Sequence, residues 1–356
     1  MRYLDIDATK KISKIGLGTW NFGSLEWNYS EDCARRQAQA IVRRALELGI
    51  TLFDTAEIYG VAAQGRSCRA LVRGLAVQDT ARIAGFGRSE RILGEALGDG
   101  QDAVLATKFY PTVPFSPAVD RHAAASARRL GTRRIDLYQL HQPGRLLRTA
   151  TVMRAVRQLQ RARLVTEVGI SNGSLAAWSA AEKALGSRVL SNQVAYSLVA
   201  RSAERDLLPF ARSNGRFVIA HSPLARGFLT AKYDSRKAPP DVSRSTTPLF
   251  LPENLDRAAK LMATLREVAH AHSATPAQVA LAWVIRHPAV AAIPGAVNIE
   301  QLEENAAAAD IELAEAEYKA LQAASSQFVP SSGSASPTRR MRRCVAAWLA
   351  RQPSVA

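Results

Sequence analysis

Residues 34–54 read ARRQAQAIVRRALELGITLFD, and this stretch contains the pattern that decides the fold. Apolar residues recur through 34–48 with a period near 3.6, which is typical of a helix that buries one face. Residues 51–53 then form a short apolar run, as expected for a strand covered on both faces. A helix followed closely by a buried strand predicts one unit of an α/β protein.

The same alternation extends along most of the chain on both sides of this stretch. Further short apolar runs predict strands at 15–17, 103–107, 135–140, 165–170, 189–194, 217–220 and 290–293. Helical patterns separate them near 117–130, 151–162, 174–185, 203–213 and 276–287. Eight strands separated by helices favour a closed parallel (β/α)8 TIM barrel over an open doubly wound sheet. We expect one domain over residues 1–327, followed by a flexible basic tail over 328–356.

Composition and charge limit the classes of protein to consider. Of 356 residues, 47% are hydrophobic and 22% are charged, which is ordinary for a globular enzyme. The net charge is +16, but the arginines are spread along the chain without interleaved aromatics. This pattern favours an anionic small molecule over nucleic acid as a partner. No stretch approaches the ~18 apolar residues of a membrane-spanning helix, so no membrane partner is expected.

The three cysteines, Cys33, Cys68 and Cys344, are far apart in the sequence. Their spacing argues against a disulfide framework and against a structural zinc site, and it suits a reducing compartment. The N-terminus lacks the apolar segment of a secretory signal. These observations predict a cytoplasmic protein without a metal; the oligomeric state has no signature in the sequence.

Four reactive side chains follow neighbouring strands of the predicted barrel. Asp54 comes directly after the strand at 51–53, and Tyr59 lies in the same loop. Lys108 follows the strand at 103–107, and His141 follows the strand at 135–140. Because catalytic groups of such barrels come from the carboxyl ends of the strands, we expect these four side chains to converge on one site.

Together the four side chains suit the addition of a hydride to a carbonyl group. The developing alkoxide needs a proton donor, and free tyrosine, with a pKa of about 10, is too weak an acid. A lysine cation beside Tyr59 would lower its pKa, and Asp54 would balance the charge of Lys108. His141 would hydrogen-bond the substrate oxygen. Taken singly, three of them have an ordinary alternative: Asp54 as a helix cap, Lys108 as a surface residue and His141 as a core histidine.

The segments that carry these residues resemble those of the aldo-keto reductase family, in the family's order. DTAEIYG at 54–60 resembles the segment of the family's catalytic aspartate and tyrosine, ATK at 106–108 that of the lysine, and DLYQLH at 136–141 that of the histidine. GLGTW at 16–20 resembles the family's opening strand and loop. The resemblance implies an NAD(P)H-dependent enzyme that reduces aldehydes or ketones reversibly, with Tyr59 as the general acid.

The resemblance also implies how the dinucleotide is bound. GISN at 169–172 and Gln193 correspond to residues that hold the nicotinamide carboxamide. HSPL at 221–224 corresponds to the segment that lies under the nicotinamide ring and receives the pyrophosphate, and 293–298 to the loop around the adenosine end. The residues implied in cofactor binding are Gly18, Thr19, Trp20, Ser171, Asn172, Gln193, His221, Ser222, Pro223, Leu224, Arg226, Pro294, Gly295, Ala296, Asn298, Gln301, Glu304 and Asn305.

The choice between NADPH and NADH depends on a cation near the adenosine end. Relatives that prefer NADP usually place Lys or Arg there, whereas this chain has Gly295, Val297 and Gln301. Losing a charge-assisted pair of ~1.5–3 kcal/mol would erode an NADPH preference. Arg226 offers a substitute cation, and the helix N-terminus at Asn298 can bind a phosphate. We expect NADPH to be favoured over NADH, as in the family.

Several rings are expected near the nicotinamide and the substrate. Most relatives place Tyr, Phe or Trp under the nicotinamide ring, whereas this chain has His221, a smaller and titratable ring. We therefore expect weaker stacking or stacking that is sensitive to pH between about 5.5 and 8. Trp20, Phe109 and Tyr110 lie on loops at strand ends and are predicted to line an apolar part of the substrate pocket, although aromatics are equally good filler for a barrel core.

An insertion follows the tyrosine loop. In relatives the Tyr-Gly pair leads almost directly into a helix start like FGRSE at 86–90, whereas here residues 61–85 intervene. GRSCRAL at 65–71 resembles GRSERIL at 87–93, which indicates an imperfect duplication. The insertion is open to three interpretations: a lid that offers arginines to an anionic substrate, a tolerated surface loop, or a second copy that docks as the helix and displaces Tyr59.

The C-terminal tail has two possible interpretations. SSGSASPT at 331–338 is followed by RRMRR at 339–343, which is either a basic amphipathic helix on an acidic surface or a solvated chain end.

The alternative to an enzyme is a regulatory, redox-sensing module that binds the dinucleotide with little turnover. The complete set of Asp54, Tyr59, Lys108 and His141 favours the enzyme.

Overall fold

The computed structural model describes residues 1–6, 10–22, 31–60, 86–98, 102–110, 117–143, 149–237, 239, 244 and 247–331. Eight strands form one parallel sheet in the order β10-β9-β8-β7-β6-β5-β4-β3, so that each strand lies beside the next along the chain. These strands are β3 (Leu17–Gly18), β4 (Leu52–Asp54), β5 (Val104–Phe109), β6 (Ile135–Leu140), β7 (Val165–Ser171), β8 (Ser191–Ala195), β9 (Phe217–His221) and β10 (Val290–Ala292). All eight predicted strands are present, within about two residues of their predicted bounds.

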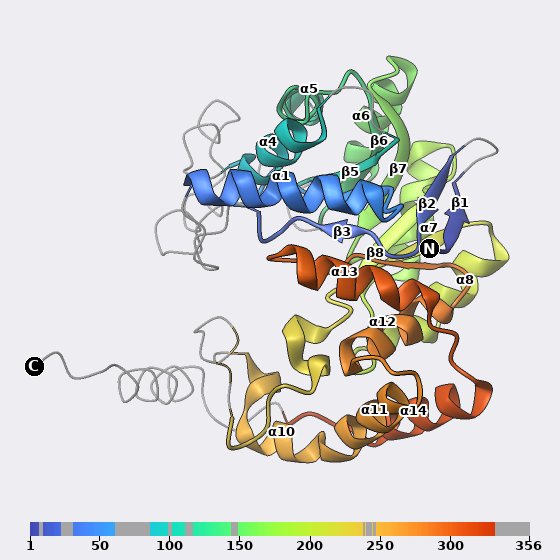
Figure 1. The fold of residues 1–356 in the computed structure, drawn as a ribbon. Helices are drawn as coiled ribbons and strands as arrows, with labels where there is room; N and C mark the ends of the chain where they lie inside the picture. The colour runs from blue at the N-terminus through green and yellow to red at the C-terminus, as the bar shows by residue number, and fades with distance from the viewer. Residues whose placement is uncertain are drawn as a thin grey trace, which may run out of the picture.

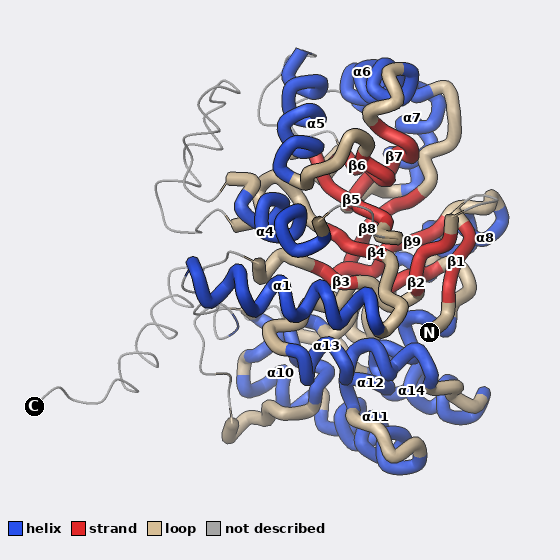
Figure 2. The backbone as a smooth tube through the Cα atoms, turned by 45° about the horizontal axis from the view of Figure 1, so that its top comes forward, coloured by secondary structure: helices blue, strands red, loops and turns tan. Residues whose placement is uncertain are grey.

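The first and last strands of the sheet meet, and this contact closes the barrel. Ile15, just before β3, pairs in parallel with Ala292 at the end of β10. The amide of Gly16 donates to the Ala292 carbonyl at 2.8 Å, and the amide of Gly18 donates to the Pro294 carbonyl at 3.0 Å. The predicted (β/α)8 barrel is therefore confirmed, and Figure 2 shows its strands inside a surround of helices.

Helices cover the outside of the barrel (Figure 1). The α-helices of the described residues are α1 (Glu31–Glu47), α4 (Arg88–Leu97), α5 (Pro117–Arg129), α6 (Thr149–Arg161), α7 (Leu175–Leu185), α8 (Leu207–Ser213), α10 (Pro252–Arg257), α11 (Ala259–Ala271), α12 (Pro276–Arg286), α13 (Ile299–Ala307) and α14 (Glu315–Gln327). The helices α10, α11 and α14 were not predicted, because they are additions to the strand–helix alternation on which the predictions were based. None of the described helices is both long enough and apolar enough to cross a bilayer.

Two helices show why these residues begin and end them. The side chain of Ser174 caps α7 by accepting from the amide of Ala177 at 3.2 Å, and Gly186 ends it with a φ of 74°. Helix α12 begins with a capping box, in which Thr275 and Gln278 each accept from the other's backbone amide, followed by Pro276. In both helices the capping residues of the sequence stand at the ends of the helix in the structure.

Replacing Thr275 with alanine should lower the free energy of unfolding by about 1 kcal/mol. The Thr275 hydroxyl accepts from the Gln278 amide at 3.2 Å and donates to Glu304 at 2.6 Å, so the substitution removes a cap and a link to α13. Urea unfolding measures this loss. Thr264→Ala is the matched control, since among the described residues the Thr264 hydroxyl bonds only the Lys260 carbonyl within α11, and the substitution should leave the unfolding midpoint nearly unchanged.

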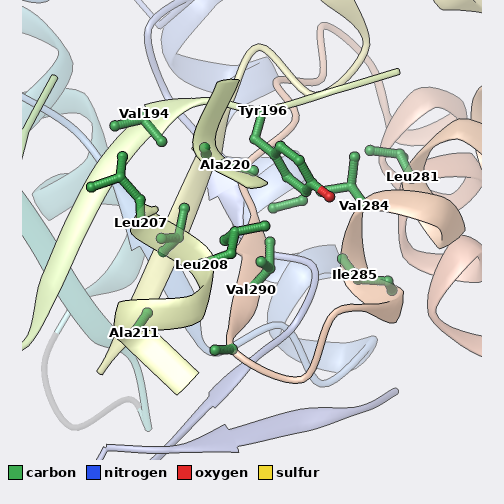
Figure 3. Close-up of a cluster of buried hydrophobic side chains, with 14 of the residues drawn as sticks. Val194, Tyr196, Leu207, Leu208, Ala211, Ala220, Leu281, Val284, Ile285 and Val290 are labelled. Carbon is green, nitrogen blue, oxygen red and sulfur yellow. The ribbon is translucent and has the colours of Figure 1, made fainter. Parts of the chain in front are cut away.

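The space between strands and helices is filled with apolar side chains. Figure 3 shows one part of it, where Ala220 and Val290 of the sheet pack against side chains from α8 and α12, including Leu207, Leu208, Leu281 and Ile285. The largest fully buried side chains include Trp178 and Trp283. This layer fixes the helices against the barrel and thereby fixes the strand ends that carry polar side chains.

A two-stranded hairpin closes the amino-terminal end of the barrel. Strands β1 (Tyr3–Asp5) and β2 (Lys11–Ser13) pair antiparallel. Ile6 and Ile12 of the hairpin are buried in one cluster with residues at the starts of the barrel strands, such as Val104 and Phe217. Polar chemistry is therefore expected at the opposite, carboxyl end. The insertion at 61–85 and the tail from 332 onward lie outside the described residues.

Candidate active site

Lys108 lies at the centre of a buried hydrogen-bond network at the carboxyl ends of β4 and β5. Its Nζ donates to Asp54 Oδ1 at 2.5 Å, to the Tyr59 hydroxyl at 2.9 Å and to the Thr55 carbonyl at 2.9 Å. The Lys108 and Asp54 side chains are 0% and 1% exposed. An ammonium group has three hydrogens, and each has an acceptor here. The structure thus brings three of the four predicted catalytic residues into direct contact.

The hydrogen bond from Lys108 decides what the Tyr59 hydroxyl can do. A phenolic hydroxyl has one hydrogen to donate, and its oxygen also accepts hydrogen bonds. Because Lys108 is the donor in this bond, the hydrogen of Tyr59 is directed to another acceptor. Tyr59 is only half-buried, so a molecule at the mouth of the barrel can reach its hydroxyl.

The pKa of Tyr59 differs from the expectation of a lowered value. Burial raises this pKa, attraction to Lys108 lowers it, and the nearby Asp54 raises it, so that the net pKa lies above the ordinary 10.0. The expectation from sequence was wrong because it left out two effects that raise this pKa, the burial of Tyr59 and the negative charge of Asp54. Tyr59 therefore keeps its proton at neutral pH, and the adjacent ammonium would stabilise a tyrosinate at this position.

Asp54 holds Lys108 in its charged form. Burial lowers the pKa of Lys108, but attraction to Asp54 and Tyr59 outweighs burial and leaves the pKa above its ordinary value. The second carboxylate oxygen of Asp54 accepts from Gln193 Nε2 at 2.7 Å and from Gln139 Nε2 at 3.3 Å. Gln193, expected to hold a carboxamide, is thus bonded to the charge network, and Gln139 is a member that the sequence analysis did not identify.

His141 contacts the Tyr59 ring. The two rings meet edge to face with centroids 5.9 Å apart, and the Tyr110 ring lies 5.6 Å from His141 in the same manner. Among the described residues, none hydrogen-bonds the buried Nδ1 of His141. Burial, with repulsion from Lys108 and His221, lowers the pKa of His141 to about 3. His141 is therefore neutral at pH 7 and has one ring nitrogen that donates and one that accepts.

The neutral state of His141 predicts a pH dependence of stability. The pKa is about 3 in the folded protein and 6.5 ordinarily, so the unfolded protein binds more protons between these values. The free energy of unfolding should therefore fall as the pH falls from about 6.5 toward 3, by at most about 1.4 kcal/mol per pH unit for this group. Urea unfolding of wild type and His141→Gln measures the slope. The slope should be shallower in His141→Gln and unchanged in His270→Gln, an exposed control; equal slopes in all three would contradict the assignment.

Strand geometry separates Lys108 from its neighbour Phe109. Successive side chains of a strand point to opposite faces, so the inward position of Lys108 places Phe109 outward. Phe109 is 1% exposed and packs against the His122 ring at 5.1 Å in the layer beneath the helices. The prediction that Phe109 lines a substrate pocket is therefore wrong. Tyr110 contacts His141, and Trp20 is 43% exposed at the barrel mouth, as a pocket lining requires.

A second buried polar pair supports the loops of the site. Glu57 Oε2 lies 2.5 Å from His122 Nδ1, and Glu57 Oε1 accepts from the Tyr110 amide at 2.8 Å. Both side chains are almost fully buried. Glu57 thus ties the loop of Tyr59 to the loop after β5. The signal in the sequence was a carboxylate inside DTAEIYG, but its distant partner on α5 had no local signature.

The ends of β7, β8 and β9 bring together the residues expected at a nicotinamide. His221 Nε2 lies 3.1 Å from Asn172 Oδ1, and Asn172 Nδ2 donates to Ser171 Oγ at 3.1 Å. The Ser171 hydroxyl donates to the Gln193 carbonyl at 3.0 Å. Burial, with repulsion from Lys108, lowers the pKa of His221 to about 4. This value argues against the expected titration between about pH 5.5 and 8.

The loop after β9 has an unusual backbone at the barrel mouth. Ser222, Ala225 and Arg226 have φ values of 52°, 49° and 59°, and Gly227 follows at 89°. Such a run of left-handed residues is costly and occurs mostly at functional sites. The Arg226 guanidinium lies over the Trp20 ring at 5.9 Å, which links this loop to the loop after β3. Ser222, Pro223, Leu224 and Arg226 thus all lie at one edge of the mouth.

The residues expected at the adenosine end form one loop and helix start after β10. Asn298 caps α13 by accepting from the Gln301 amide at 2.9 Å, and Gln301 Oε1 accepts from the Val297 amide. Asn305 Nδ2 donates to the Gly295 carbonyl at 3.2 Å. These bonds shape the segment from Pro294 to Asn298 and leave a helix N-terminus at the mouth, which suits an anion. Glu304 is bonded instead to Thr275, the residue that caps α12.

Comparison with known proteins decides the family. The profile of the Aldo/keto reductase family matches residues 14–326. The chain belongs to the aldo-keto reductase family. This aldo-keto reductase is therefore an NAD(P)H-dependent oxidoreductase, as the resemblance in its motifs implied.

Individual relatives agree with this placement. This aldo-keto reductase is 47% identical over 333 residues to an oxidoreductase of Mycobacterium tuberculosis, covering 93% of this chain and 95% of the relative. It is 32% identical over 329 residues to the methylglyoxal reductase YeaE of Escherichia coli, covering 91% and 94%. Among solved structures, an aldo/keto reductase of Klebsiella pneumoniae in complex with NADP and acetate superposes with a TM-score of 0.68 at 28% identity, covering 93% of this chain and 96% of that one.

Proposed function

We propose that this aldo-keto reductase reduces small aldehydes or ketones to alcohols, favours NADPH over NADH, and uses Tyr59 as its general acid. The observation that carries the proposal is the 2.9 Å hydrogen bond from the buried Lys108 ammonium to the Tyr59 hydroxyl. A phenol that stays protonated at neutral pH, beside a cation that stabilises its conjugate base, suits protonation of a forming alkoxide.

The side chains divide the work on the carbonyl group. A reduced nicotinamide, when bound, would be the source of the hydride for the carbonyl carbon. As the C=O π bond breaks, Tyr59 gives its proton to the oxygen, and Lys108 with Asp54 stabilises the tyrosinate. Neutral His141 donates a hydrogen bond to the same oxygen and orients it. Proton and hydride together convert C=O to CH–OH, and the reverse reaction uses the same groups.

The donor set at the strand ends fits a nicotinamide dinucleotide. Asn172 and Ser171 offer amide and hydroxyl groups that match a carboxamide, and His221 offers a flat ring beside them. Arg226 and the N-terminus of α13 at Asn298 offer positive potential for phosphates. We assign the barrel to residues 1–327 as one catalytic domain, with 61–85 as an insertion and 328–356 as a tail whose first residue, Phe328, packs in the core.

Relatives support the substrate class and the cofactor. The Escherichia coli relative is named for methylglyoxal, a small dicarbonyl. Two Klebsiella pneumoniae neighbours are complexes with NADP or NADPH. A further neighbour, with a TM-score of 0.77 at 25% identity, is a glycerol dehydrogenase of Gluconobacter oxydans. Small, oxygen-rich carbonyl compounds are therefore the first substrates to test.

The experiment is a cofactor titration followed by turnover. Fluorescence quenching with NADPH and NADH gives the preference, and oxidation of the tighter cofactor is then followed with methylglyoxal, 4-nitrobenzaldehyde and simple ketones. We expect tighter NADPH binding and turnover of at least one aldehyde. Binding of the dinucleotide without turnover of any of these carbonyls would instead favour the regulatory module.

A further inference from the structure

A hollow of about 650 Å³ opens at the amino-terminal end of the barrel, opposite the Lys108 network. It lies between the ends of α4 and α5 and the starts of β5 and β6. Its apolar lining includes Leu97, Leu105 and Leu130. Its polar lining includes Lys10, Asp136 and three arginines, Arg133, Arg134 and Arg163. The proposed reduction uses none of these residues.

The described residues that line the hollow have an excess of positive charge. Lys10 pairs with Asp136 Oδ1 at 2.5 Å, and Asp136 Oδ2 accepts from the Leu105 amide at 3.0 Å, so this carboxylate is already engaged. Arg133, Arg134 and Arg163 are exposed, and no carboxylate of the described residues forms an ion pair with any of them. Three guanidinium groups around one hollow create a positive potential that attracts an anion.

Stabilisation of helix ends does not explain these arginines. Cations stabilise a helix mainly within its last turn. The last turns of α5 and α6 already contain Arg128, Arg129 and Arg161, and Arg129 pairs with Glu90 at 2.6 Å. Arg133, Arg134 and Arg163 lie beyond those turns.

The backbone of Arg163 places its side chain at the edge of the hollow. Arg163 follows α6 with a φ of 58°, the left-handed conformation that favours glycine. Helices α5 and α7 are followed by glycine in this conformation, Gly131 at 66° and Gly186 at 74°. At α6 the chain instead has an arginine that lines the hollow, at a cost of order 1 kcal/mol.

We propose that this hollow binds a small amphipathic organic anion, with its carboxylate or phosphate head between Arg133, Arg134 and Arg163 and its aliphatic chain against the leucines. The lining has cations for the head and aliphatic side chains for the tail. None of the described residues that line it is aromatic, so a nucleotide base would find no aromatic ring to stack on. This site is separate from the dinucleotide site, which lies at the carboxyl ends of the strands.

The test uses octyl phosphate as the probe and the full-length protein saturated with NADPH. Isothermal titration calorimetry should show one site, and octanoate should bind to the same site. The variant Arg133→Gln/Arg134→Gln/Arg163→Gln should lose at least roughly ten-fold in affinity, since each charge-assisted contact contributes. Arg43→Gln, at an exposed arginine of α1, is the charge control and should bind as wild type does. NADPH-dependent turnover should be unchanged in both variants.

Four outcomes would overturn the proposal. They are equal affinity of wild type and the triple variant for octyl phosphate, equal affinity of wild type for 1-octanol, equal affinity of wild type for inorganic phosphate, and octyl phosphate binding to the NADPH-free protein that is lost when NADPH saturates it. Sedimentation with phosphatidylglycerol vesicles covers the remaining alternative, because binding to vesicles but not to monomeric octyl phosphate would assign the hollow to a membrane surface. Failure of this test would leave the reductase proposal intact, since the two sites lie at opposite ends of the barrel.

Discussion

Replacing Lys108 with methionine should reduce kcat/KM for carbonyl reduction by at least roughly a thousand-fold and also destabilise the fold. Lys108 donates to Asp54, Thr55 and Tyr59 at the same time, so its removal takes away the cation that stabilises the tyrosinate. It also leaves the Asp54 carboxylate buried without its ion-pair partner, which typically costs on the order of 3–5 kcal/mol. Steady-state kinetics and urea unfolding measure the two effects.

Lys14→Met is the matched control for this substitution. Lys14 is also buried, but it lies at the amino-terminal end of the barrel, where its Nζ donates to the carbonyls of Ile285 and His287. Its removal can affect stability but should leave kcat unchanged. If both lysine variants lost activity in proportion to their stability, the special role of Lys108 would be refuted.

Replacing Tyr59 with phenylalanine should lower kcat by roughly a hundred- to ten-thousand-fold while NADPH binding is kept. The substitution removes only the hydroxyl, and the half-buried ring keeps its contacts with His141 and Lys108. Single-turnover oxidation of bound NADPH by 4-nitrobenzaldehyde measures the chemical step, and fluorescence quenching measures binding.

Tyr138→Phe serves as the control for Tyr59→Phe. The Tyr138 hydroxyl is buried and has no hydrogen-bond partner among the described residues, and the ring lies in the outer core. Its removal should leave turnover unchanged. A Tyr59→Phe enzyme as fast as Tyr138→Phe would show that another group donates the proton.

The barrel and the order of its strands were predictable because buried parallel strands leave short apolar runs between helical patterns. The gathering of polar side chains at the carboxyl ends of β4, β5 and β6 was predictable for the same reason, since Asp54, Lys108 and His141 follow those runs directly. It was harder to predict to which face of a strand a side chain points. Phe109 follows Lys108 on the strand, and only the alternation of side chains shows that it faces the helices.

Contacts between distant segments were beyond the sequence. Glu57 meets His122 from α5, and Gln139 of β6 meets Asp54 of β4, and neither pair has a fixed spacing along the chain. The sequence also did not predict that the pKa of Tyr59 is raised, because burial is a property of the packed structure. The arginines of the amino-terminal hollow are spread along the chain, and the fold gathers them.

A double-mutant cycle on Tyr59 and Lys108 tests the central claim most directly. If the phenol and the ammonium act as one proton-donating unit, the double variant Tyr59→Phe/Lys108→Met should be no slower in kcat/KM than the slower single variant. Losses that multiply in the double variant, or a wild-type enzyme without NADPH-dependent carbonyl turnover, would contradict the account.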